Sequence, residues 1–225
     1  MTHIPEEHTP MLTPEQRAIL QRLLGDNPAL TPLRSGLLDA YALLQGAFEA
    51  GGKLLLCGNG GSAADADHIV GELMKGFLKR RPLTAEERAL LDDTPDMPAG
   101  FADRLQGALP ALSLNTHGAL LSAYANDVDA SMVYAQQVWA LGQGGDALLA
   151  LSTSGNSRNV VNAVHAARAK GLRTLAITGE KESALSALCD VTLRLPSAET
   201  YRVQEYTLPV YHALCALLEA AFFAE

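Results

Sequence analysis

The sequence predicts an α/β fold in which helices cover both faces of a parallel sheet. The chain holds five short apolar runs of strand length, and most are followed by a stretch in which apolar residues recur at helical spacing. Continuous apolar runs are typical of parallel strands that are buried on both faces, and their alternation with helices indicates a layered α/β domain. The predicted strands are residues 53–57, 109–114, 146–151, 172–177 and 190–195.

Two helices are expected before the first strand. Residues 1–11 are predicted to be an N-terminal tail, and residues 12–225 a single domain. Between residues 12 and 50 apolar residues return at helical spacing, and the turn-forming sequence GDNP at 25–28 divides this stretch into two N-terminal helices.

The later helices are expected between the strands and after the last one. They are predicted over residues 62–79, 118–125, 131–141, 157–170, 182–188 and 201–223. Residues 80–107 interrupt this alternation with prolines and acidic residues, so we interpret them as an insertion on the surface. Within it, Thr84 followed by Glu87 predicts a capping box at the start of one short helix.

Composition and charge narrow the functional class. The chain has 225 residues and a net charge of −8, which argues against a nucleic-acid-binding surface. No apolar stretch approaches the roughly 18 residues that a membrane-spanning helix needs, and the N-terminus lacks the apolar core of a signal peptide. The three cysteines form no CxxC pair and are expected to be reduced thiols. We therefore expect a cytoplasmic protein without a nucleic-acid or membrane partner.

Two loops at the carboxyl ends of predicted strands are candidates for binding a phosphate monoester. The first is the glycine loop, Gly58-Asn59-Gly60-Gly61-Ser62, and the second is the serine loop, residues 152–157. Glycines let the backbone approach an anion, and the helix that follows supplies free N–H groups. The serine loop adds the hydroxyls of Ser152, Thr153, Ser154 and Ser157. The alternative is a pair of tight turns in which serine serves as a helix N-cap.

Neither loop matches a nucleotide-binding motif. The Walker motif ends in Gly-Lys-Ser/Thr, and the dinucleotide motif is GxGxxG. The sequence GNGGSA lacks the lysine of the first and places its third small residue differently from the second. We therefore expect no nucleotide cofactor.

Two helices carry polar groups that suit a catalytic or metal site. His68 and Glu72 are four residues apart, so they share one helix face, where such a pair is more often a surface contact than a metal site. The closing helix adds Gln204 and His212 in an apolar context. These two are eight residues apart, about 12 Å along a straight helix, which counts against one shared ion, although Pro209 permits a kink.

Several motifs together resemble one known family. The motifs are CGNGGSAADADHIVGEL, ANDVDASMVYAQQVWALG, LSTSGNSRNVVNAVHAARAKGL, AITG and YRVQEYTLPVYHALC. They resemble the SIS (sugar isomerase) domain of sedoheptulose 7-phosphate isomerases, also called phosphoheptose isomerases, over about residues 34–223 apart from 80–107. The resemblance implies a three-layer α-β-α sandwich with a five-stranded parallel sheet, flavodoxin-like, with additional N-terminal helices. It also implies a homotetramer with active sites between subunits.

The resemblance assigns roles to individual residues. The phosphate would be bound by Ser152, Thr153, Ser154 and Ser157. The sugar phosphate would further contact Asn59, Gly60, Gly61, Ser62, His117, Asn126, Asp127 and Gln204. One zinc ion per subunit would be held by His68, Glu72, Gln204 and His212, although Gln204 is also suited to a substrate hydroxyl. Proton transfer would fall to Glu72 and His212.

The implied reaction is aldose–ketose isomerisation, in which sedoheptulose 7-phosphate gives D-glycero-D-manno-heptose 7-phosphate. A similar branch, the initiator-associating SIS protein that forms a tetramer and binds the replication initiator DnaA, lacks the counterparts of Glu72 and His212, which this chain keeps. A regulatory sugar-phosphate sensor is another alternative. Two features depart from the family: His117 stands where an aspartate is usual, and the 80–107 connection is longer. Tyr134 and Trp139 are interpreted as packing groups, with a subunit contact as an alternative.

Overall fold

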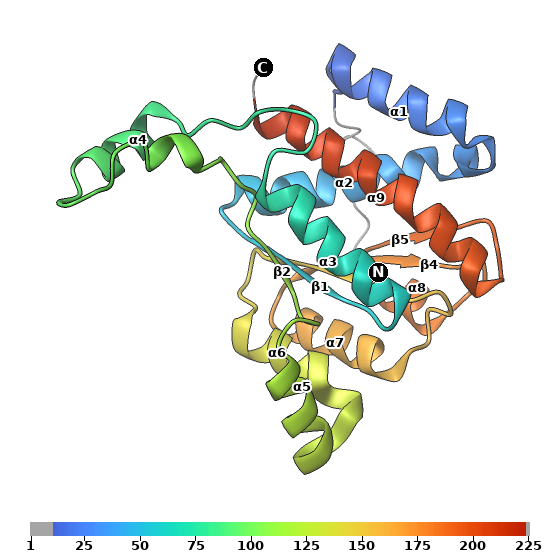
Figure 1. Cartoon of the computed structure of the whole chain (residues 1–225). Coiled ribbons are helices and arrows are strands. Elements are labelled where there is room, and N and C mark those ends of the chain that lie inside the picture. Colours follow the sequence, from blue (N-terminus) through green and yellow to red (C-terminus); the bar gives the residue numbers. More distant parts are fainter. Residues whose placement is uncertain (1–10, 224–225) are drawn as a thin grey trace.

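A five-stranded sheet lies at the centre of the molecule (Figure 1). The structure is a computed structural model that describes residues 11–223. The strand order is β2-β1-β3-β4-β5, and every neighbouring pair is parallel. The strands are β1 (Leu54–Cys57), β2 (Ala111–Ser113), β3 (Ala147–Leu151), β4 (Arg173–Thr178) and β5 (Val191–Arg194). All five predicted strands are confirmed, with ends that shift by one or two residues.

Helices cover both faces of the sheet. They are α1 (Pro14–Asp26), α2 (Arg34–Glu49), α3 (Gly61–Met74), α4 (Ala85–Asp92), α5 (Gly118–Tyr124), α6 (Val133–Leu141), α7 (Arg158–Ala169), α8 (Ala184–Leu188) and α9 (Thr200–Phe222). Short 3₁₀ segments occupy Pro28–Leu33, Ala102–Arg104 and Ala130–Met132, and a π-helical segment occupies Ala125–Asp129. None of these helices in residues 11–223 is long and apolar enough to cross a membrane.

The strand residues alternate between two hydrophobic cores, which gives the molecule three layers. Leu54 and Leu56 of β1 join the core formed with α1, α2, α3 and α9. Leu55 and Cys57 join the opposite core, formed with α6, α7 and α8. Because successive side chains of a strand point to opposite faces, a strand in this position has to be apolar at every residue. This explains the uninterrupted apolar runs of the sequence.

Helix α3 is shorter than predicted. The prediction placed its end at residue 79, whereas the helix ends at Met74. The buried carboxylate of Glu219 in α9 accepts hydrogen bonds from the backbone N–H groups of Phe77, Leu78 and Lys79 at 2.7–3.2 Å. These donors cannot also serve a continuing helix. The termination, which Gly76 also favours, is therefore supported by a contact between residues about 140 positions apart.

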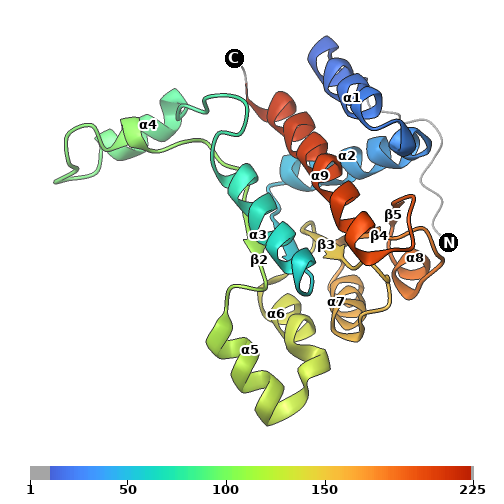
Figure 2. The same ribbon diagram turned by 45° about the vertical axis from the view of Figure 1, so that its right-hand side comes forward.

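Residues 83–105 form an arm that projects from the body (Figures 1 and 2). It carries α4, which begins with the predicted capping box of Thr84 and Glu87. None of residues 83–105 is buried. The two ends of the arm meet where the N–H of Gly107 donates to the carbonyl of Arg81 at 2.7 Å. The arm thus leaves and rejoins the body at one point.

The predicted N-terminal tail lies almost wholly outside the described residues, which begin at residue 11.

The long helix α9 runs from Thr200 to Phe222 as one helix, with Pro209 inside it. It packs against α3, with Gly61 beside Gln204 and His68 beside His212. The two helices therefore run side by side in the same direction, so that matching positions along them face each other.

Candidate active site

Three helices begin around a small polar cavity. The glycine loop joins β1 to α3, the serine loop joins β3 to α7, and α9 begins at Thr200. Because β1 and β3 are neighbours in a parallel sheet, both loops emerge at the same edge. The cavity has a volume of about 320 Å³. It is lined by Asn59, Gly60, Gly61, Ser62, Leu151, Ser152, Thr153, Ser157, Thr200 and Gln204.

The glycine loop has a backbone that larger residues would not fit. Gly60 precedes α3 with φ of +56°, in the left-handed region that favours glycine. At Gly61, an added Cβ atom would lie 2.5 Å from Nε2 of Gln204. The lack of side chains here keeps the start of α3 open and lets α9 approach it closely.

The cavity offers hydrogen-bond donors without a full positive charge. All ten residues that line it are uncharged at neutral pH. The hydroxyls of Ser152 and Ser157 are hydrogen-bonded to each other at 3.1 Å, and both residues line the cavity. The starts of α3 and α7, helices of 14 and 12 residues, contribute free N–H groups and the positive ends of their dipoles. This arrangement suits an anionic group with several oxygens.

About two turns further along α3 and α9 lies a second polar cluster, which we call the histidine cluster: His68, Glu72, Tyr211 and His212. His68 Nε2 lies 3.0 Å from Glu72 Oε1, and its Nδ1 lies 2.8 Å from the hydroxyl of Tyr211. The rings of His68 and His212 are 5.1 Å apart. Nε2 of His212 is buried and has no hydrogen-bond partner among the described residues.

The surroundings of the cluster set its protonation. Burial raises the pKa of Glu72, but the hydrogen bond and charge of Lys75, together with those of His68, outweigh burial and leave this pKa below its ordinary value. Burial, helped by the nearby His68, lowers the pKa of His212. At neutral pH the pair is therefore an ionised carboxylate beside a neutral imidazole. That pair can accept and return protons.

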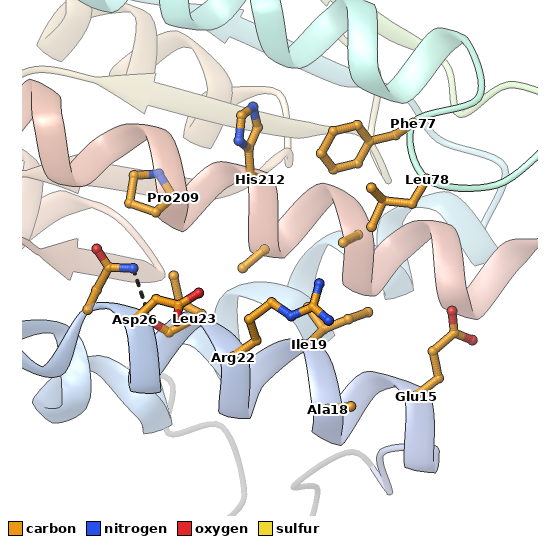
Figure 3. A pocket seen from close by; sticks show the side chains of 13 residues that line it. Glu15, Ala18, Ile19, Arg22, Leu23, Asp26, Phe77, Leu78, Pro209 and His212 are labelled. Carbon is orange, nitrogen blue, oxygen red and sulfur yellow. Dashed lines mark hydrogen bonds between the residues drawn. The ribbon is translucent and has the colours of Figure 1, made fainter.

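His212 also borders a larger hollow between α1 and α9, with a volume of about 510 Å³ (Figure 3). Pro209 and His212 line it from α9, while Ile19 and Leu23 line it from α1. Phe77 also lines the hollow, and the centroid of its ring lies 5.3 Å from the centroid of the His212 ring. The imidazole thus lies between this mostly apolar hollow and the side chain of His68.

Comparison with known proteins identifies the family. The SIS domain family model matches residues 29–108 and 97–179. A phosphoheptose isomerase of Pelobacter propionicus is 37% identical over 209 residues, covering 93% of this chain and 94% of that protein. The enzyme of that name from Thermodesulfovibrio yellowstonii is 38% identical over 185 residues, covering 82% of this chain and 80% of its own length. The chain belongs to the phosphoheptose isomerase family.

Solved structures of the family agree with this fold. Phosphoheptose isomerase GmhA from Neisseria gonorrhoeae aligns with a TM-score of 0.70 and 31% identity, covering 91% of this chain and 95% of that one. A phosphoheptose isomerase from Francisella tularensis aligns with a TM-score of 0.68 and 28% identity, covering 91% and 94%. The predicted α-β-α sandwich with a five-stranded parallel sheet is confirmed.

The residues matched to the family's metal ligands divide between the two sites. His68, Glu72 and His212 lie together in the histidine cluster. Gln204 instead lines the polar cavity, with its amide against Gly61. Within residues 11–223 no three His, Cys, Asp or Glu side chains are arranged as a metal site.

Some residues matched to the family's substrate contacts lie outside the polar cavity. Ser154 borders a neighbouring hollow of about 240 Å³. Asn126 and Asp127 are exposed in the π-helical segment, where the Asn126 amide donates to Asp127 at 2.8 Å. His117 is half-buried, with Nδ1 2.7 Å from Gln137 Oε1.

Sequence reasoning missed two residues that the structure places at the site. Thr200 lines the polar cavity from the start of α9, and its position as the first residue of that helix was the available signal. Tyr134, interpreted as a packing group, places its hydroxyl 2.6 Å from the carbonyl oxygen of Gly58 in the glycine loop. A sequence gives no signal that separates a packing tyrosine from one whose hydroxyl is used.

Proposed function

We propose that this chain isomerises a sugar phosphate, converting sedoheptulose 7-phosphate into D-glycero-D-manno-heptose 7-phosphate. The observation that carries the proposal is the placement of two sites along one helix pair. A cavity suited to phosphate lies at the starts of α3 and α9, and the histidine cluster lies about two turns further on. Gln204 and His212 are separated by eight residues, about 12 Å of helix. This spacing suits a substrate with several carbons between its phosphate and its carbonyl.

The reaction moves one proton between C1 and C2 through an enediol. We assign Glu72, ionised at neutral pH, as the base that takes the proton from C1 of the ketose. We assign His212 to proton transfer at the two oxygens: it supplies a proton to the C2 oxygen and accepts one from the C1 hydroxyl. Glu72 then returns its proton to C2, which completes the aldose. Each residue ends in its starting protonation state, so the cycle needs no other reactant.

The histidine cluster contains the donor types of a zinc site, although in this structure its side chains are not arranged around a metal position. Imidazole nitrogens and a carboxylate are ordinary zinc ligands, and the buried Nε2 of His212 has no partner among the described residues. We propose that His68, Glu72 and His212 would hold the ion at rest, and that Glu72 and His212 would leave it to transfer protons, because an atom bound to zinc cannot also carry a proton. When bound, zinc would polarise the substrate carbonyl as a Lewis acid. Gln204, at the polar cavity, is assigned to a substrate hydroxyl.

The remaining family positions are assigned to substrate contact. Ser152, Thr153 and Ser157 would bind the phosphate together with the glycine loop, because they line the same cavity. Ser154, His117, Asn126 and Asp127 lie outside that cavity, so we assign them to a site completed by a second subunit of a homotetramer. In place of the usual aspartate, His117 offers an imidazole ring, which can donate hydrogen bonds as a carboxylate cannot, and we expect it to influence which sugar is accepted. A cytoplasmic location belongs to the same proposal.

Turnover in deuterated buffer tests the function. The protein is incubated with sedoheptulose 7-phosphate, with and without added zinc, and with fructose 6-phosphate as a shorter ketose. We expect aldose product and incorporation of solvent deuterium at C2, observed by NMR, with the seven-carbon substrate preferred. Substrate binding without product or deuterium incorporation would contradict the isomerase and favour a regulatory sugar-phosphate sensor.

A further inference from the structure

Tyr134 connects two loops at the edge of the candidate site. It belongs to α6, and its side chain is buried. Its hydroxyl lies 2.6 Å from the carbonyl oxygen of Gly58 and 2.7 Å from Oδ1 of Asn115. A third oxygen, Oδ1 of Asn59, is 3.4 Å away. Gly58 and Asn59 begin the glycine loop, whereas Asn115 lies in the connection from β2 to α5. One hydroxyl therefore contacts both segments.

Few side-chain contacts hold the glycine loop, although the carbonyls of Asn59 and Gly60 accept hydrogen bonds from N–H groups at the start of α3. Three of its five residues are glycines, which have the greatest backbone freedom in the absence of contacts. Asn59 is exposed and exchanges hydrogen bonds with Asn159 at 2.9 Å, a contact that water can replace. The contact between Gly58 and Tyr134 is buried. An unpaired buried carbonyl is costly, so this contact favours a single loop conformation.

The phenol stays a hydrogen-bond donor throughout the physiological range. Burial is the main cause that raises the pKa of Tyr134 to about 12, and the nearby Cys57 and Asp67 contribute. Tyr134 is not among the residues that line the polar cavity. It can therefore affect a ligand there only through the loop that it holds.

We propose that Tyr134 is a positioning residue for phosphate binding. Its hydroxyl fixes Gly58 so that the following residues, Gly60 to Ser62, present the start of α3 to the phosphate. The proposal deepens the proposed function and rests on its phosphate cavity. It does not depend on the identity of the sugar or on turnover.

Removal of one hydroxyl tests this role. Tyr134→Phe keeps the ring and its packing. The matched control is Tyr41→Phe, because Tyr41 is also buried and its hydroxyl accepts a hydrogen bond from Gln16 at 2.7 Å, in contact with α1 rather than with the glycine loop. Both variants lose one buried hydrogen bond, so both should lose some thermal stability.

The two variants should differ at the site. We expect Tyr134→Phe to weaken binding of inorganic phosphate, measured by calorimetry, by roughly fivefold to tenfold, the effect of about one hydrogen bond. KM for the sugar phosphate should rise by a similar factor with kcat nearly unchanged. Amide hydrogen exchange should become faster in residues 58–62. Tyr41→Phe should change none of these three quantities.

Each outcome separates the positioning role from the isomerase proposal. Unchanged phosphate affinity and unchanged loop exchange in Tyr134→Phe would overturn the positioning role, whatever the activity. Equal changes in both variants would also overturn it, because they would show a general loss of stability. If the wild type binds phosphate but does not turn over the sugar, the isomerase proposal fails, while the phosphate and exchange measurements still decide the role of Tyr134.

Discussion

The carboxylate of Glu72 has a different partner on each oxygen. Oε1 lies 3.0 Å from His68 Nε2, and Oε2 lies 3.0 Å from Nζ of Lys75. Burial alone would raise its pKa, as it does for Asp65 nearby. The two nitrogen partners reverse the direction and hold the pKa of Glu72 below its ordinary value. A buried carboxylate that stays ionised is suited to take a proton from carbon, provided that one partner can move aside.

Glu72→Gln tests this role. The amide keeps the size of the side chain but cannot act as a base, so we expect kcat to fall by about 10²–10⁴, the usual effect of a general acid or base. The measurement is turnover of sedoheptulose 7-phosphate beside a melting curve. Glu205→Gln is the control, since Glu205 lies on the exposed side of α9 with Arg202 at 2.5 Å. An unchanged kcat in Glu72→Gln would remove Glu72 from the mechanism.

Helical spacing predicts only part of this cluster, and His212 is expected from the family resemblance. The i, i+4 spacing of His68 and Glu72 is visible in one helix, because helical periodicity is local. Their approach to His212 depends on how α3 packs against α9, about 140 residues away in the chain. The placement of Gln204 at the phosphate cavity follows from the same packing: with α3 and α9 side by side, Gln204 faces Gly61.

At the scale of elements, one buried ion pair joins the end of α3, the base of the arm and the end of α9. Arg81 and Glu219 are each 1% exposed, and their charged groups lie 2.8 Å apart. The guanidinium also donates to the carbonyls of Leu73 and Glu72 at 2.6 and 3.0 Å. The last turn of α3, which carries Glu72, is therefore fixed from α9. All of these contacts lie outside the arm itself.

Deletion of the arm tests whether the body depends on it. Residues 83–105 would be replaced by Gly-Ser-Gly, which can close the gap because Arg81 and Gly107 are already hydrogen-bonded neighbours. Since none of the deleted residues is buried, we expect a change in unfolding free energy of about 1 kcal/mol or less, measured by urea unfolding. A variant that does not fold would show that the arm supports the core. Arg88→Ala, which breaks only an exposed pair with Asp103 inside the arm, is the milder comparison.

The elements differ in how well the sequence predicts them. The five strands are predicted closely because each apolar run is only of strand length and is flanked by turn-forming residues. The capping box at Thr84 is predicted to the residue, since it involves only positions three apart. The end of α3 is missed although Gly76, which follows the C-cap residue Lys75, is a local stop signal; Glu219 then binds the following N–H groups from a distant part of the chain. Apolar runs and helix caps can be predicted from neighbouring residues, whereas contacts between distant segments of the chain cannot.

At the scale of the whole molecule, α5 and the segment that leads from it to α6 project beyond the body (Figure 2). Several apolar side chains of α5, of this segment and of α6 are exposed. These side chains are Leu120, Val128, Met132, Trp139 and Leu141. Neither α5 nor the π-helical segment has a buried residue. The same segment holds Asn126 and Asp127, which the family resemblance assigns to the substrate. An exposed apolar segment that carries site residues is suited to contact a second subunit and complete its site.

Mixing two inactive variants tests whether sites are shared between subunits. Glu72→Gln lacks the base but keeps Asp127, whereas Asp127→Asn keeps Glu72 but lacks the carboxylate of the projecting segment. If Glu72 of one subunit works with Asp127 of another, tetramers formed at a one-to-one ratio after unfolding and refolding together should recover about a quarter of wild-type activity, since half of the subunits supply each intact residue. Light scattering should give four times the 23.8 kDa chain mass for every sample. Each variant refolded alone should stay inactive. No recovery in a mixture that scatters as a tetramer would place both residues in the same subunit's site, and a monomer mass would contradict the assembly itself.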